Sequence, residues 1–247
     1  MHPPTVRAPT TAQLIEAWDL AFPRPALERA ETLLALASPD ADAAALDALT
    51  LGERERRLLA VRAAAFGSKI TGLTACEACG EPLELELAVD ELLGLTAPAP
   101  GEILLNHGDC TLSLRLPNGA DLRAAAQAPA GAAAAVLLAR CVSRAERNGA
   151  PVDAAKLPAG VAEAAGEALA QADPLADLRL GLSCVACDHA WRAPFDAAGF
   201  LWAELDAWAG RLLREVHTLA SAYGWTERDI LALSPARRAR YLDMVAG

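Results

Sequence analysis

The spacing of apolar residues predicts helices at both ends of the chain. Near the N-terminus, apolar side chains recur every three to four positions in segments that proline and charged residues separate, which predicts helices over 11–20, 26–37, 41–49 and 52–66. Beyond residue 196, one stripe steps regularly by three or four positions; its members are Leu201, Leu205, Trp208, Leu212, Val216, Leu219 and Tyr223. Gly224 is placed to end that helix, and Thr226 and Ser234 are placed to cap two shorter ones.

Between these helical ends the period changes to two. Alternating leucines predict half-buried strands over 83–89, 112–116 and 178–182. The strand at 112–116 is expected to pair with residues 103–105 across the intervening turn. The stretch 121–172 is predicted to return to alanine-rich helices, with breaks near Pro129, Asn148–Gly149 and Pro158. Six segments follow from this pattern: a flexible arm (1–10), a helical part (11–67), a first cysteine knuckle with strands (68–122), a helical insert (123–175), a second knuckle (176–196) and a C-terminal helical hairpin (197–247).

Composition narrows the choice of partners. Hydrophobic residues make up 53% of the chain, but aromatic residues only 4%, so much of the apolar content is alanine, which buries little area per residue. The net charge of −10 argues against nucleic acid as a partner, since phosphate contacts normally need basic residues. The longest stretch of weakly polar residues, 124–142, is alanine-rich and contains Pro129 and Arg140, so no membrane insertion is expected. No secretory signal is visible at the N-terminus, and we expect a cytoplasmic protein.

The cysteines carry the clearest chemistry. Two CxxC pairs, Cys76/Cys79 and Cys184/Cys187, each border a predicted strand. A CxxC at the tip of a hairpin turns both sulfurs toward one point, and two such knuckles form a tetrahedral site of four thiolates. Soft thiolates in a closed four-coordinate site suit Zn²⁺. The sequence therefore predicts one structural zinc ion per chain, held by these four cysteines.

The 104 residues between the two pairs do not argue against this site. Compared with a compact zinc ribbon, the longer loop adds about 1.6 kcal/mol of closure entropy. Structural zinc contributes roughly 10–16 kcal/mol in zinc-finger peptides, far more than that cost.

Other roles for these cysteines stay open. A redox CxxC normally lies at a helix N-terminus, which lowers the thiol pKa, whereas both pairs here border strands. His189, two residues beyond Cys187, is an alternative metal ligand. Cys110 and Cys141 are predicted to be small core residues.

Catalytic motifs are absent from the sequence. No HExxH, GxxxxGK[ST], GxGxxG or GxSxG pattern appears, and the four histidines are far apart. The expected class of function is therefore non-enzymatic. The helix and strand patterns together predict an α+β fold class, predominantly α-helical, with a small antiparallel β zinc-ribbon-like element built from two distant CxxC knuckles.

The C-terminal region resembles a known family. The segments FLWAEL (200–205), AYGWTE (222–227) and ILALSPARRARYL (230–242) resemble the T4-like phage baseplate hub assembly (chaperone) family, whose members also accompany phage-tail-like contractile injection systems in bacteria. The cysteine pairs and the turn RLPNGADL (115–122) are similar to the bacterial branch. The likeness is strong over roughly 176–245 and weaker over 52–122.

This resemblance implies a non-enzymatic assembly factor or minor structural subunit of the baseplate hub, made in the bacterial cytoplasm. Such a protein either leaves after assembly or is incorporated into a phage or phage-tail-like particle. Its partners are then other hub or tail proteins. We expect apolar helical surfaces to bind them, around the large aromatic residues Phe200, Trp202, Trp208, Trp225 and Tyr241. The alternative from another class is a zinc-ribbon nucleic-acid or transcription-associated module. A dithiol oxidoreductase is a third.

Overall fold

A bundle of four helices forms the body of the molecule. The computed structural model describes residues 7–95 and 101–246. The body consists of α1 (Thr11–Ala21), α2 (Ala26–Ala37), α4 (Leu51–Phe66) and the first part of the long α9 (Ala197–Tyr223). These helices meet in one apolar core of leucine, valine and alanine: Leu14, Leu33, Leu34, Ala37, Leu58, Val61, Leu201 and Leu205. The predicted arm 1–10 lies largely outside the described residues.

Local capping explains where the body helices begin and end. Thr10 and Gln13 form a reciprocal capping box at the start of α1, and Thr50 accepts a hydrogen bond from Glu53 N–H at the start of α4. Asp196 caps α9 in the same way, and Gly224, in the left-handed conformation, ends it. The predicted bounds of all four helices agree with the structure to within a residue or so.

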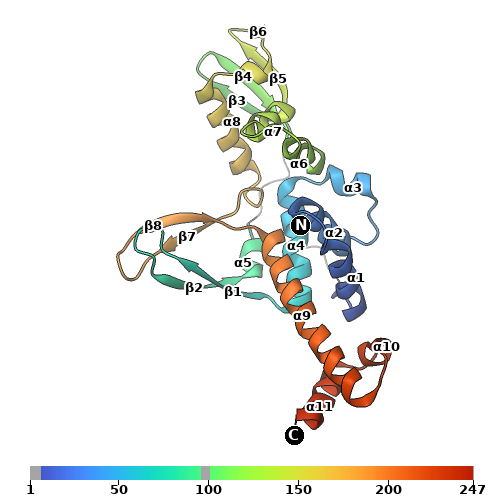
Figure 1. The fold of residues 1–247 in the computed structure, drawn as a ribbon. Coiled ribbons are helices and arrows are strands. Elements are labelled where there is room, and N and C mark those ends of the chain that lie inside the picture. The colour runs from blue at the N-terminus through green and yellow to red at the C-terminus, as the bar shows by residue number, and fades with distance from the viewer. Residues whose placement is uncertain (1–6, 96–100, 247) are drawn as a thin grey trace.

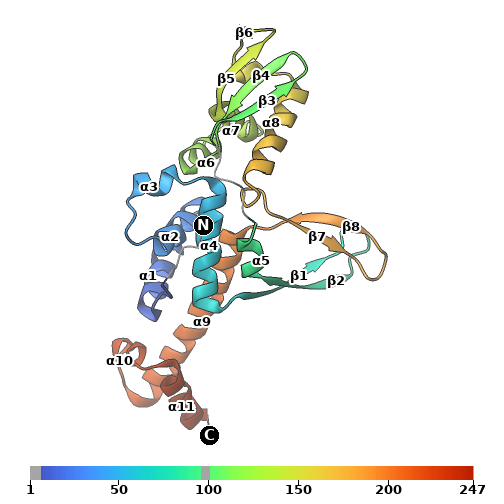
Figure 2. The same cartoon turned by 180° about the vertical axis from the view of Figure 1, so that it is seen from behind.

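Two separate hairpins form a projecting arm, which we call the metal arm (Figures 1 and 2). The first hairpin pairs β1 (Lys69–Ala75) with β2 (Pro82–Ala88), and the second pairs β7 (Arg179–Ser183) with β8 (Ala190–Pro194). No strand of one hairpin pairs with a strand of the other within the described residues. In both views the hairpins run side by side away from the body, and their tips lie at the far end of the arm.

A second apolar cluster anchors the base of this arm. It joins the body and both hairpins through Leu59, Ile70, Val89, Leu92, Leu175, Leu178 and Ala197. The short helix α5 (Val89–Leu93) follows β2 directly and contributes two of these residues.

Residues 101–172 form a distinct lobe, the sheet lobe, at the other end of the body from the C-terminus (Figure 1). Its antiparallel sheet has the order β3-β4-β5-β6, built from β3 (Ile103–His107), β4 (Cys110–Leu114), β5 (Val142–Arg147) and β6 (Ala150–Pro151). The helix α8 (Ala159–Ala172) packs on one face through Val161 and Ala165. Three further short helical elements complete the lobe: α6 (Gly119–Ala126), α7 (Ala133–Cys141) and the 3₁₀ turn η1 (Ala154–Lys156). The small α3 (Ala43–Ala48) lies beside α6.

The strand β5 corrects the sequence-based prediction that 121–172 contains only helices and the breaks between them. Residues 142–147 form a full partner of β4, so the hairpin predicted near 103–116 belongs to the same sheet as the insert. Alanine-rich flanks hide this strand, because helix propensity is a weak prior that pairing with a neighbouring strand overrides.

The C-terminal lobe comprises residues 211–246: the end of α9, α10 (Glu227–Leu231) and α11 (Pro235–Ala246). Thr226 and Ser234 cap the two short helices, as the sequence predicts. Its apolar core cluster has three buried residues, Val216, Leu219 and Ile230. Across the described parts of the chain, no helix has the length and apolarity needed to cross a membrane.

Candidate metal centre

The tips of the two hairpins of the metal arm bring the four predicted cysteines together. Cys76 and Cys79 lie between β1 and β2, and Cys184 and Cys187 lie between β7 and β8. Their four sulfur atoms all lie within 4.8 Å of one another. The mixed α+β fold, mostly helical with small antiparallel sheets, and the clustering of two distant CxxC pairs are therefore both confirmed.

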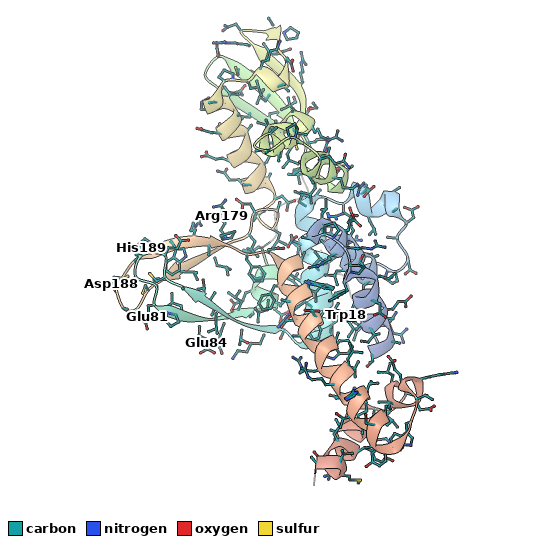
Figure 3. The ribbon with its side chains drawn as sticks, in the orientation of Figure 1. Trp18, Glu81, Glu84, Arg179, Asp188 and His189 are labelled. Carbon is teal, nitrogen blue, oxygen red and sulfur yellow. The ribbon has the colours of Figure 1, made fainter. Side chains whose placement is uncertain are left out.

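The two knuckles have the same backbone hydrogen bonds. In the first, Cys76 N–H donates to the carbonyl of Glu81 and Gly80 N–H donates to the carbonyl of Cys76, both at 2.9 Å. In the second, Cys184 N–H donates to the carbonyl of His189 and Asp188 N–H donates to the carbonyl of Cys184, also at 2.9 Å. Figure 3 shows Glu81 and His189 at corresponding positions on the two hairpins. The same backbone turn thus positions the cysteines of both CxxC pairs.

The residue after each second cysteine adopts a left-handed backbone. Gly80 has φ +76° and Asp188 has φ +56°. Glycine takes this conformation without steric cost, and aspartate tolerates it better than most other residues. A glycine or aspartate immediately after a CxxC is therefore a sequence signal for this turn, and at Asp188 our sequence analysis did not use it.

The sulfur–sulfur distances test whether a metal ion fits. Cys76 Sγ lies 3.7 Å from Cys187 Sγ, and Cys79 Sγ lies 3.6 Å from Cys184 Sγ. A tetrahedral zinc site with Zn–S bonds of about 2.3 Å places its sulfurs about 3.8 Å apart, whereas a disulfide needs about 2.05 Å. The four cysteines are free thiols, and their spacing fits one metal ion at the centre of the cluster.

Four sulfur donors leave no coordination position for a substrate. Structural metal sites have this closed set of four ligands, whereas catalytic zinc keeps one position open for water. The geometry is consistent with one structural metal ion that joins the two hairpins.

The four thiols differ in burial, and neighbouring groups shift the pKa values of Cys76 and Cys79 in opposite directions. Cys76 and Cys184 are buried, whereas Cys79 and Cys187 are exposed at the surface of the arm. Burial opposes ionisation of Cys76, but hydrogen bonds from the N–H groups of Cys79 and Ala78 outweigh it and lower the pKa of Cys76 to about 6. At Cys79 the N–H of Glu81 favours the thiolate, but the sulfurs of Cys187 and Cys184 prevail and raise its pKa to about 12. One thiolate therefore forms readily, and four together need a bound cation to balance their charge.

The other candidate ligand lies outside the cluster. His189 stacks on Trp191, with ring centroids 5.6 Å apart and planes 15° from parallel. Its backbone carbonyl accepts the hydrogen bond from Cys184 N–H, and its ring is not part of the four-sulfur cluster.

A buried ion pair fixes the base of the first hairpin to the body. Arg62 of α4 is only 4% exposed and donates two hydrogen bonds to the carboxylate of Glu204 on α9, at 2.7 and 2.6 Å. The same guanidinium donates to the carbonyls of Gly67 and Lys69, where the chain enters β1. One side chain thus connects α4, α9 and the root of the metal arm. The sequence-based predictions did not identify this pair.

Apolar packing within the arm is sparse. Beyond Ile70, which is buried at the base, the larger inward side chains of the two hairpins are only partly buried; they are Leu83, Leu85, Leu87, Leu180, Leu182 and Trp191. Outward positions carry glutamates and other polar groups, with Glu84 labelled on the first hairpin and Arg179 on the second in Figure 3. Because two narrow hairpins cannot close a core between them, the four-cysteine cluster is the principal link at the tips.

The five aromatic residues proposed to bind partners do not form one patch. Trp202 and Trp208 pack at the edge of the body core, and Phe200 packs at the base of the metal arm. Trp225 and Tyr241 meet in the C-terminal lobe, with ring centroids 4.8 Å apart. All five are partly buried, so each contributes to a core as well as to the surface. In Figure 3 Trp18 lies between α1 and α9, where its indole N–H donates to Asp206 at 2.8 Å.

The two remaining cysteines are core residues, as predicted. Cys110 is 2% exposed and Cys141 is fully buried. Burial raises the pKa of both thiols, to about 11 for Cys141, so neither is an activated nucleophile.

Comparison with protein-family models, curated proteins and solved structures finds no match for this chain.

Proposed function

We propose that this protein is a non-enzymatic assembly factor or minor structural subunit of the baseplate hub of a phage tail or phage-tail-like contractile injection system, stabilised by one structural zinc ion. It acts in the bacterial cytoplasm by binding other hub or tail proteins, either as a transient chaperone or as a subunit that stays in the particle. The observation that carries the proposal is the resemblance of 200–242 to the baseplate hub assembly family.

The metal centre supports the adaptor part of this role. A closed tetrathiolate site has no position for substrate, and it holds together two hairpins that are distant in sequence. Metal binding of this kind contributes its free energy to folding. A rigid arm that needs no large apolar core suits a protein that presents surfaces to several partners.

The metal is tested first. Elemental analysis of the purified chain is expected to give one zinc per molecule, and Cys76→Ser is expected to lose it. Cys141→Ala removes a buried cysteine outside the cluster and serves as the matched control, which should keep its zinc. A wild-type chain without metal, with redox-active cysteine pairs, would support the dithiol oxidoreductase instead.

The baseplate role is tested in the native operon. Tagged protein is expected to co-purify with tail hub proteins, and deletion of its gene should stop formation of complete tails. A protein that purifies alone, and whose deletion leaves tail assembly intact, contradicts the proposal.

The nucleic-acid alternative finds little support at the metal arm. The first hairpin carries Glu77, Glu81, Glu84 and Glu86 against one basic residue, Lys69, and four thiolates around a dication add two more negative charges. Such a surface repels phosphate. Filter binding of DNA and RNA at low salt separates the two functions, because a nucleic-acid module gives strong retention that salt abolishes.

A further inference from the structure

Two distant regions, the C-terminal lobe and the metal arm, expose large apolar side chains. Of the ten large hydrophobic residues exposed in the described chain, the C-terminal lobe holds four: Leu213, Tyr223, Met244 and Val245. The two most exposed of the ten are Val185, at 89%, and Leu73, at 83%, and both lie on the metal arm. Exposed apolar groups rimmed by charge are typical of protein-binding surfaces.

The C-terminal lobe is the basic part of an acidic chain. Residues 211–246 carry six arginines and four acidic residues, a net charge of +2, whereas the whole chain carries −10. Arg238 is buried and paired with Glu215 at 3.0 Å. Among the residues that the structure describes, the other five arginines of the lobe have no carboxylate within 4.0 Å: Arg211, Arg214, Arg228, Arg237 and Arg240.

Charge and apolar groups share one face of α11. Arg237, Arg240 and Met244 follow one another at intervals of three and four residues, which places them along one side of the helix. All three are exposed, while Arg238 and the partly buried Tyr241 turn toward α9. This face therefore offers two unpaired cations beside an exposed thioether.

The metal arm has the complementary character. Leu73 lies directly opposite Glu84 in the register of the first hairpin, and Thr71 lies opposite Glu86, so these side chains share the outer face. Glu84 extends from this hairpin on the side away from the second hairpin (Figure 3). Of these two carboxylates, only Glu86 has a cationic partner, Lys69.

The two surfaces cannot meet within one molecule. The metal arm leaves the body beside the start of α9, and the C-terminal lobe lies at its other end. A helix of 27 residues spans about 40 Å, and Figures 1 and 2 both show the arm and the lobe projecting in different directions.

We propose that the C-terminal lobe of one molecule docks on the outer face of the first hairpin of a second copy, pairing Arg237 and Arg240 with Glu84 and Glu86 around Met244 and Leu73. The contact joins two different surfaces, so it is heterologous and propagates head to tail into a ring or a filament. It is independent of the proposed baseplate role, since it rests only on charge and exposure in this chain.

Sedimentation velocity of the zinc-loaded full chain tests the contact. Self-association is expected at about 50 mM salt and loss of it at about 500 mM, because screening shortens the reach of exposed charges. Reversing two charges on the lobe, Arg237→Glu with Arg240→Glu, should weaken the association constant at least about tenfold. The arm variant, Glu84→Lys with Glu86→Lys, should do the same.

Mixing the two charge-reversed variants is the decisive test. Each is defective alone, but the reversed lobe of one matches the reversed arm of the other, so the mixture should associate. Glu163→Lys with Glu167→Lys makes the same charge change on the exposed side of α8 and is the control, which should associate like wild type. Zinc content and circular dichroism establish that all variants fold.

Three results overturn the proposal. A wild-type chain that stays monomeric at low salt excludes docking to a second copy, even where a hub protein binds the lobe. If the control variant loses association as strongly as the arm variant does, the association depends on net charge alone and not on the proposed contact. Salt-sensitive retention of nucleic acid by the lobe, without self-association, assigns the arginines to phosphate.

Discussion

In the body, eight buried residues from four helices form a continuous apolar core; in the metal arm, two hairpins face each other with side chains that stay partly exposed. The body is held together by area removed from water, about 25 cal/mol for each Å². The arm has an apolar anchor only at its base, and four sulfurs join its tips. The two regions are therefore expected to lose their structure for different reasons.

The largest effect is expected from loss of the metal. Chelation, or Cys184→Ser, removes a link that contributes roughly 10 kcal/mol in zinc-finger peptides. Hydrogen exchange over 69–88 and 179–194 should rise to nearly unprotected rates, while α4 and α9 keep their protection. If the hairpins stay protected without metal, apolar packing holds the arm and the contrast with the body disappears.

Truncation in the body should act in the opposite way. Leu205 is fully buried between α9 and its neighbours, and Leu205→Ala leaves a cavity that is expected to cost about 4 kcal/mol in free energy of unfolding. Urea denaturation followed by circular dichroism measures it, and zinc content should not change. Leu213→Ala, on the same helix but 39% exposed, is the matched control and should cost less than about 1 kcal/mol.

The connection between the two regions has an intermediate effect. Arg62→Ala leaves the carboxylate of Glu204 and the carbonyls of Gly67 and Lys69 without their donor, which is expected to cost about 3 kcal/mol. Urea unfolding should show the loss. Arg192→Ala, an exposed position on the second hairpin, should change little. If the two variants are equally stable, Arg62 does not stabilise the junction between the body and the metal arm.

The smallest effect is expected in the sheet lobe and depends on pH. Asp121 is fully buried and accepts hydrogen bonds from Arg115, Arg140 and the backbone N–H of Asn118. Burial alone raises the pKa of this carboxyl, but those donors outweigh it and lower the pKa to about 2. A depressed folded-state pKa gives stability that is complete above the unfolded value of about 3.9 and is lost as the pH falls toward 2.

The amount is at most about 2 kcal/mol, because both arginines are nearly half exposed and solvent screens them. The difference in urea stability between wild type and Asp121→Asn should therefore shrink between pH 6 and pH 3. A difference that does not change with pH would mean that the carboxylate charge contributes nothing.

The sequence predicted the elements that have strong local signals. Helices with caps and regular apolar stripes were placed well, and alternating leucines located β2, β4 and β7. The two CxxC pairs were assigned to one site, and their sulfurs converge. Each of these predictions rests on spacing within about twenty residues, or on a residue type with few other uses.

Other features could not be predicted in this way. The strand β5 depends on pairing with β4, about 30 residues earlier in the chain, and its alanine-rich neighbours carry the opposite propensity. The pair Arg62–Glu204 joins residues 142 positions apart, and nothing near either residue marks it as buried. The aromatic residues at 200–241 read as one cluster along the chain, but they are distributed over three cores.

The sequence alone determined where the helices at the two ends of the chain lie, which cysteines act together, and that the chain is acidic, because these depend on local spacing and on composition. Only the tertiary structure decided that the arm has no closed core, that Arg62 is buried, and that the acidic and basic surfaces lie too far apart to meet in one molecule. Those features depend on where the ends of a 27-residue helix lie and on which side chains lose water, and these are properties of the packed fold.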